Sequence, residues 1–154
     1  MKTRTILLTL ATLFAAVAVC FAADVNMGTW KLSEAKSKIS PGTAKNYTVV
    51  YAAAGDSVKI TVDGVDAAGK PTHNEWTGKF DGKDYPVIGD PASDMRSYTR
   101  VNASTLDITV KKGGKVTVTG SVAVAADGKS RTLTINGTDA KGKKYTNTAI
   151  YDKK

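Results

Sequence analysis

The chain has 154 residues, of which 42% are hydrophobic and 23% charged, and its formal net charge at pH 7 is +8. This length predicts one domain with a core of its own, and the single cysteine, Cys20, excludes an intramolecular disulfide. The basic charge favours contact with anionic surfaces. Nucleic acid is not expected as a partner, because no run of basic residues is interleaved with aromatic residues.

The first 23 residues have the pattern of an export signal. Two basic residues lie near the start, residues 6–21 form an apolar run without charge, and Ala22 and Ala23 offer small side chains for cleavage. The run is too short to predict a membrane-spanning helix. We therefore expect an exported protein, periplasmic or secreted, with a single domain over residues 24–154 and a formal charge lowered from +8 to +6.

Cys20 lies inside this predicted signal and suggests an alternative localisation. The preceding residues, V-A-V, resemble a lipobox, in which the cysteine carries a lipid. Val19 is bulkier than the glycine, alanine or serine that usually precedes such a cysteine. We therefore expect export without lipidation, and an outer-membrane lipoprotein anchored through Cys20 remains the alternative.

A segment that recurs 73 residues later dominates the remaining chain. Residues 57–75 read SVKITVDGVDAAGKPTHNE, and residues 130–148 read SRTLTINGTDAKGKKYTNT. Apolar residues at alternate positions, such as Val58, Ile60 and Val62, predict a strand with one buried face. The shared D-A-x-G-K sequence favours a tight turn. Each copy is therefore predicted to form a β-hairpin.

Ten short strands are predicted after the signal. Turn sequences such as Asp81-Gly82 and Gly113-Gly114 separate them. Residues 33–45 have room for about one helical turn before Pro41-Gly42, and no later stretch has a sustained helical pattern. The predicted strands are 26–32, 46–53, 57–62, 71–80, 85–88, 95–101, 105–111, 115–125, 130–138 and 145–151.

These strands predict an all-β fold, an antiparallel up-and-down β-barrel of about ten strands that is closed or nearly closed. Closure removes exposed sheet edges without any disulfide. A ten-stranded barrel is wider than an eight-stranded barrel, whose interior side chains roughly fill it. We therefore expect room for a small ligand.

Short motifs resemble the calycins, the superfamily of lipocalins and intracellular fatty-acid-binding proteins. Residues 28–32, GTWKL, are similar to the calycin G-x-W, which places a tryptophan across the closed end of the barrel. Residues 147–153, NTAIYDK, resemble the closing strand of fatty-acid-binding proteins. Residues 78–87, GKFDGKDYPV, are similar to small exported bacterial lipocalin-like proteins of unassigned function. The resemblance implies a ligand-binding barrel.

Two features depart from the fatty-acid-binding proteins. Those proteins insert two helices between the first two strands, and residues 33–45 are too short and too broken for two. Their closing strand carries an arginine two residues before a tyrosine, which holds a carboxylate, and here Ala149 takes that place. The resemblance therefore implies a binding role for Tyr151 alone, without a carboxylate site of that design.

Arg96, Tyr98 and Arg100 share one face of a predicted strand. If this face points inward, two guanidinium groups flank a phenol and could grip an anionic headgroup. If it points outward, the alternate residues from Met95 to Val101 line the interior. We favour the outward orientation, because burying an unpaired charge is costly, and we keep the three residues as candidates for ligand binding.

Aromatic side chains lie within the predicted strands and are expected to face inward. They either fill the core or line a cavity, and in a calycin-like barrel the cavity is part of the core. The further candidates for ligand binding are Tyr47, Tyr51, Trp76 and Tyr151.

Catalytic and metal sites are not expected. His73, the only histidine, shares a strand face with Glu75, which could orient it as a general base. No nucleophile is evident beside them, so a solvated strand face is the preferred interpretation. The oxygen donors of the two repeated turns lack the spacing of a calcium loop. We predict no enzyme activity, no metal and no cofactor.

An up-and-down meander places its odd-numbered connections at one end of the barrel. These connections are predicted at 33–45, 63–70, 89–94, 111–115 and 139–144, and they hold ten lysines against six acidic residues. The sequence therefore predicts a basic rim that attracts the barrel to an anionic membrane or envelope surface.

The sequence is compatible with two functions. The first is an exported, lipocalin-like protein that holds a small hydrophobic or amphipathic molecule in the barrel cavity. The alternative is a structural or interaction protein of the cell envelope, with a filled barrel and a basic rim. A lined void of roughly 300 Å³ or more favours the first function, and a filled interior favours the second.

Overall fold

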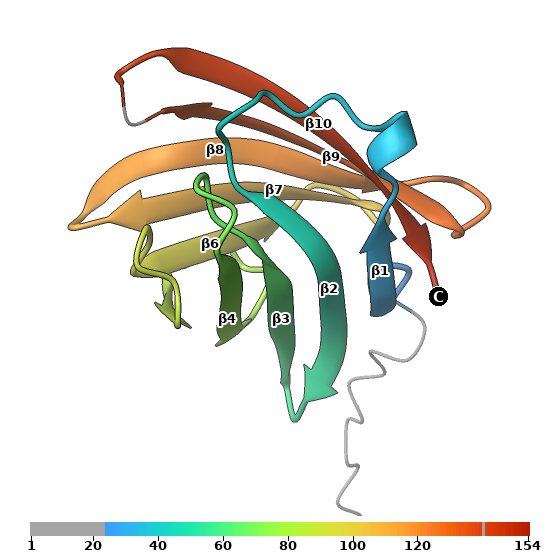
Figure 1. Cartoon of the computed structure of the whole chain (residues 1–154). Helices are drawn as coiled ribbons and strands as arrows, with labels where there is room; N and C mark the ends of the chain where they lie inside the picture. The colour runs from blue at the N-terminus through green and yellow to red at the C-terminus, as the bar shows by residue number, and fades with distance from the viewer. Residues whose placement is uncertain (1–23, 140) are drawn as a thin grey trace, which may run out of the picture.

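The computed structural model describes residues 24–139 and 141–154, which form a closed antiparallel β-barrel of ten strands (Figure 1). Each strand pairs with its neighbours in sequence, and β1 pairs with both β2 and β10. The predicted fold class is therefore confirmed. The predicted export signal and Cys20 lie outside the described residues. Within those residues, no helix is long and apolar enough to cross a membrane.

The strands agree closely with the ranges expected from the sequence. One 3-10 turn, η2 (Glu34–Lys36), follows β1 as predicted. The strands are β1 (Gly28–Leu32), β2 (Lys45–Ala54), β3 (Ser57–Val65), β4 (Pro71–Gly78), β5 (Tyr85–Ile88), β6 (Met95–Arg100), β7 (Thr105–Lys112), β8 (Lys115–Val124), β9 (Ser130–Thr138) and β10 (Lys144–Lys153).

The two copies of the repeat form the same turn. In the β3–β4 hairpin, the Asp66 carboxylate accepts hydrogen bonds from the backbone N–H groups two and four residues further on, at 2.8 and 2.9 Å. In the β9–β10 hairpin, Asp139 accepts the corresponding pair, both at 2.9 Å. Gly69 and Gly142 complete the turns with φ angles of 81° and 79°, which glycine adopts without steric cost.

Two buried tryptophans organise the barrel interior. The indole nitrogen of Trp30 on β1 donates to the backbone carbonyl of Asn26 at 2.8 Å. That of Trp76 on β4 donates to the backbone carbonyl of Arg96, also at 2.8 Å. Both rings therefore bury their apolar area without leaving an N–H group unpaired, and the surrounding inward positions carry mainly valine, isoleucine, leucine and tyrosine.

A β-bulge in β2 turns Tyr47 away from the interior. The pairing with β3 shifts register between Asn46 and Thr48, and Tyr47 is exposed. A Cβ atom on Gly64 of β3 would lie only 2.1 Å from the Lys45 carbonyl oxygen, so the close approach of the strands requires glycine. The prediction that Tyr47 faces inward was wrong because strand alternation does not reveal a bulge.

Strand β6 buries the face that we expected to point outward, the face of Arg96 and Tyr98. Arg96 is 8% exposed, whereas Met95 and Val101 are 38% and 55% exposed. One guanidinium nitrogen of Arg96 donates to the Asn74 side-chain oxygen at 3.2 Å and lies 3.9 Å from the Asp90 carboxylate. These partners offset the cost of burying the charge. The expectation of an outward face was wrong because it treated the arginine as unpaired.

The connection between β1 and β2, residues 33–44, lies along β10 and is called the strap here. Lys38 forms a bridge with Thr148 through two backbone hydrogen bonds, at 2.7 and 2.8 Å. The buried amide of Asn147 accepts from the Ser40 backbone N–H at 2.8 Å and donates to the Thr43 hydroxyl at 2.9 Å. The strap therefore continues along β10 beyond the end of β1.

Candidate functional site

The odd-numbered connections share one end of the barrel, which we call the lysine end. Every neighbouring pair of strands is antiparallel, so successive connections alternate between the two ends. Figure 1 shows the turns after β7 and β9 together on the left, while the β8–β9 turn lies on the right. The strand order confirms the predicted grouping for Lys45 and for the seven lysines of the later turns. Lys36 and Lys38 of the strap lie further along β10, beside Asp152 and opposite Thr148.

Most lysines at this end have no acidic partner. Lys45 and Lys111 pair with Glu34 and Asp84 at 3.1 and 2.6 Å. Lys36 of the strap pairs with Asp152, at the far end of β10, at 3.1 Å. Within residues 24–139 and 141–154, six lysines of this end make no ion pair within 4.0 Å, and all six are exposed: Lys70, Lys112, Lys115, Lys141, Lys143 and Lys144.

Four of the six carboxylates in the odd-numbered connections accept hydrogen bonds from their own or a neighbouring turn. Asp66 and Asp139 accept from the N–H groups of their own turns. Asp90 accepts from the Ser93 hydroxyl at 2.5 Å, and Asp94 accepts from a backbone N–H of the β7–β8 turn at 2.7 Å. These four carboxylates are half-buried, whereas the unpaired lysines are exposed. The outermost charges at this end are therefore mainly positive.

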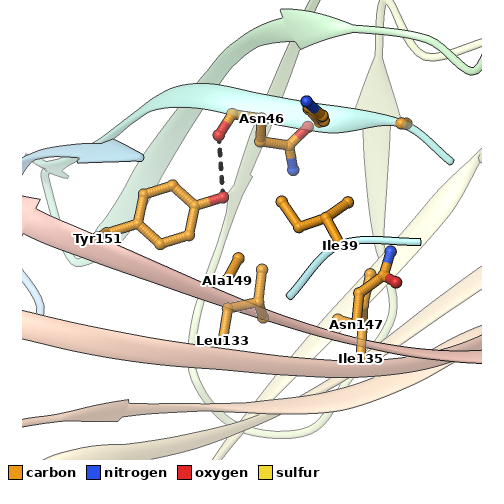
Figure 2. A pocket seen from close by; sticks show the side chains of 9 residues that line it. Ile39, Asn46, Leu133, Ile135, Asn147, Ala149 and Tyr151 are labelled. Carbon is orange, nitrogen blue, oxygen red and sulfur yellow. Dashed lines mark hydrogen bonds between the residues drawn. The ribbon is translucent and has the colours of Figure 1, made fainter. Parts of the chain in front are cut away.

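A small pocket opens at the same end, between β2, the strap and strands β9 and β10. Figure 2 shows Ile39 of the strap facing Ala149 and Tyr151 of β10. The Tyr151 hydroxyl donates to the Asn46 carbonyl at 3.0 Å, and burial raises the pKa of this phenol to about 12. The pocket volume is about 30 Å³, which is the space of about one water molecule.

The central candidates for ligand binding contact one another instead of lining a void. The Trp76 and Tyr98 rings meet edge to face with centroids 4.8 Å apart, and Tyr51 lies 6.4 Å from Tyr98. Phe80 stacks beside Trp76 at 6.4 Å. Burial, and then the neighbouring Tyr98, raise the pKa of the Tyr51 phenol, so it stays protonated. The structure thus brings Tyr51, Trp76 and Tyr98 together as packed core.

The two candidate arginines on β6 do not form a joint anion clamp. Arg96 is buried toward the lysine end, where it contacts Asn74 and the β5–β6 turn. Arg100 lies at the opposite end of the strand, where it pairs with Asp24 and covers the Phe80 ring at 5.1 Å. Each guanidinium therefore has its own local partners.

Sequence reasoning missed a third arginine in the interior. Arg131 on β9 is 3% exposed, and its guanidinium carbon lies 4.8 Å from the ring centroids of Trp30 and Tyr51 and 5.0 Å from that of Tyr151. The sequence repeat could have identified it. Arg131 occupies the position of Val58 in the first copy, and Val58 points inward.

His73 lies on the outer face of β4 and belongs to a cross-strand contact. Its Nδ1 atom is 2.7 Å from the Asp63 carboxylate, while Glu75 pairs with Lys59 at 2.8 Å. The hydrogen bond that His73 donates to the Asp63 carboxylate is the largest cause that raises the pKa of His73. In the second copy of the repeat, the corresponding residues also form a hydrogen bond, at 2.7 Å. This recurrence indicates a structural contact between paired strands.

The described residues contain no group of three or more histidine, cysteine, aspartate or glutamate side chains arranged to hold a metal ion.

No protein-family profile and no curated protein sequence matches the chain. Two solved structures are similar in shape. The first is EF1p2_mFAP2b bound to DFHBI, with 13% identity over 86% of this chain and 97% of that chain and a TM-score of 0.48. The second is a redesigned β-barrel, b11L5F_LGL, with 15% identity over 88% and 97% of the two chains and a TM-score of 0.44. Because both TM-scores are below 0.5, the description of the fold rests on the strand pairing of this chain.

Proposed function

We propose that this protein is a non-catalytic interaction module of the cell envelope, a filled β-barrel that binds an anionic surface through its lysine end. The observation that carries the proposal is the group of six exposed lysines without acidic partners at this end of the barrel. The pocket beneath the strap supports a scaffold role, because about 30 Å³ is well below the space that small-molecule ligands need. A larger hollow of about 370 Å³, over residues of β7, β8 and β9, is shallow and open to solvent. Export is part of the proposal and depends on the pattern of residues 1–23.

The exposed lysines at one end of the barrel would attract an anionic surface. Each lysine close to an anionic surface contributes about 1 kcal/mol of attraction, which decays within a Debye length. Charges that face one direction add, whereas the same charges scattered over a barrel would not act on one surface. The barrel supplies a rigid frame that keeps the five turns at one end.

Binding to a polyanion tests the proposal. The purified protein is expected to bind dextran sulfate resin, with affinity that falls as salt rises, and not to bind neutral dextran. Changing Lys141, Lys143 and Lys144 to glutamate should weaken binding by about tenfold or more. The matched control changes Lys83, Lys129 and Lys154, at the opposite end, by the same total charge. Equal weakening by both variants would overturn the proposal.

A second candidate function is the calycin-like binding of a small hydrophobic or amphipathic molecule. The observation that favours it is the apolar pocket beneath the strap, which is lined by Ile39, Leu133 and Ile135 and has the polar tip of Tyr151 beside it. A ligand larger than a water molecule would have to displace Ile39. Contact with Tyr51, Trp76 and Tyr98 would require the aromatic core to repack.

Native mass spectrometry distinguishes the second candidate. A small molecule that repeatedly co-purifies with the protein, or saturable uptake of a fluorescent lipid, would support it. An Ile39→Trp variant, which enlarges the side chain over the pocket, should then reduce that uptake. Absence of both signals in the wild-type protein would count against a ligand-carrying role.

A further inference from the structure

Exposed apolar side chains gather at the lysine end. Within the part of the chain that the structure describes, five large hydrophobic residues are exposed. Four of them lie at the strand ends next to the odd-numbered connections: Tyr47, Ile88, Met95 and Val116. The fifth, Val101, follows the opposite end of β6. Single exposed apolar residues are ordinary, but their accumulation at the charged end of the barrel is not explained by folding.

Three of these residues lie on the outer face across β5 to β8, with Lys111 between two of them, and are called the apolar rim patch: Ile88, Met95 and Val116. Met95 is directly opposite Lys111 on β7, and Lys111 is directly opposite Val116 on β8. At the usual strand spacing, Met95 and Val116 are therefore roughly 10 Å apart. Ile88, which is 70% exposed, lies two residues beyond Pro86, the partner of Met95 on β5.

Two unpaired lysines lie next to this patch. Lys112 and Lys115 face each other across the β7–β8 turn, immediately after Lys111 and before Val116. Like charges that are directly opposite on paired strands repel each other. In the described structure neither lysine has an acidic partner within 4.0 Å, so an external anion between them would relieve this repulsion.

We propose that the anionic surface is a lipid bilayer, with the apolar rim patch inserted at the boundary between headgroups and acyl chains and Lys112 and Lys115 at the phosphates. This inference rests on the proposed function and names its partner. A bilayer interface accepts apolar and cationic side chains next to each other, because lysine stems cross the apolar layer while the ammonium groups stay at the headgroups. A hydrated polyanion offers charge but no apolar phase for Ile88.

Vesicle sedimentation provides the test. The purified protein is expected to bind phosphatidylcholine vesicles that contain phosphatidylglycerol and to ignore vesicles of phosphatidylcholine alone. The double variant Ile88→Ser and Val116→Ser leaves the charge unchanged and should weaken vesicle binding by about tenfold, because two exposed aliphatic side chains no longer insert. Its binding to dextran sulfate should not change. Val101→Ser, at the opposite end, is the matched control.

The outcomes separate this inference from the proposed function. Binding to dextran sulfate without binding to anionic vesicles overturns the bilayer inference and leaves the proposed function in place. Binding to neither surface overturns both. Vesicle binding that is unaffected by the double variant overturns insertion of the patch. An Ile88→Trp variant gives an independent reading, since its fluorescence should shift to shorter wavelength on anionic vesicles, and no shift counts against insertion.

Discussion

The guanidinium of Arg131 on β9 lies over the indole ring of Trp30 on β1, with its central carbon 4.8 Å from the ring centroid. The two strands are not neighbours, because β10 lies between them. The contact therefore crosses the interior at the place where the barrel closes. Within the described residues, Nε and Nη1 of Arg131 have no hydrogen-bond partner, so its stabilisation comes mainly from the aromatic rings around it.

Replacing Arg131 should reveal this packing role. Arg131→Ala leaves a gap between three aromatic rings and loses their cation–π contacts, so we expect it to lower the free energy of unfolding by about 3 kcal/mol. Arg131→Met fills most of the volume without burying a charge and should cost about 1 kcal/mol or less. Urea denaturation measures both. An alanine variant as stable as the wild type would contradict this account.

The two repeated turns should respond equally to loss of their aspartates. Asp66→Ala and Asp139→Ala each remove an acceptor of two backbone N–H groups, and each should lower the free energy of unfolding by about 1–2 kcal/mol. The effects should add in the double variant, because the turns are independent. Asp127→Ala, which removes one such bond, serves as the control in thermal denaturation. Clearly different losses of stability in the two single variants would refute the structural equivalence of the two turns.

The bulge in β2 should depend on Gly64. Gly64→Ala places a methyl group against the Lys45 carbonyl oxygen, and we expect a loss of about 2–3 kcal/mol in the free energy of unfolding. In Gly113→Ala, at the β7–β8 turn, the added methyl group has no atom within 4 Å. The only cost is that alanine must adopt a positive φ, which should lower the free energy of unfolding by about 1 kcal/mol. Urea midpoints at constant m-value test the difference. Equal costs would show that the close strand contact is unimportant.

The pKa of His73 should be raised above 6.5 in the folded protein, mainly by the hydrogen bond that the ring donates to Asp63. A raised folded-state pKa means that protonated His73 stabilises the fold below its unfolded-state pKa, and that this contribution is lost as pH rises through the folded-state pKa. Because His73 is the only histidine, its ring protons give a single NMR titration curve. Asp63→Asn should lower the midpoint, and an unchanged midpoint would contradict the assignment.

The sequence by itself determined the order and number of the strands. Alternating apolar residues identify a strand locally, and glycine-containing turns mark where the chain reverses, so neither signal needs information from distant residues. The lysine end followed from the same information, because antiparallel neighbours force alternate connections to opposite ends. The repeat also placed Arg131 at the position of an inward valine, although this was recognised only in the structure.

Only the tertiary structure decided which face of β6 is buried and how far the interior is filled. A period of two shows which residues share a face, but both faces of β6 carry polar groups, and the choice depends on Asn74 and Asp90, which other elements supply. Tyr47 was turned outward by a bulge that depends on Gly64 of the next strand. The interior volume depends on how side chains from all ten strands interlock, and no single stretch of sequence contains that information.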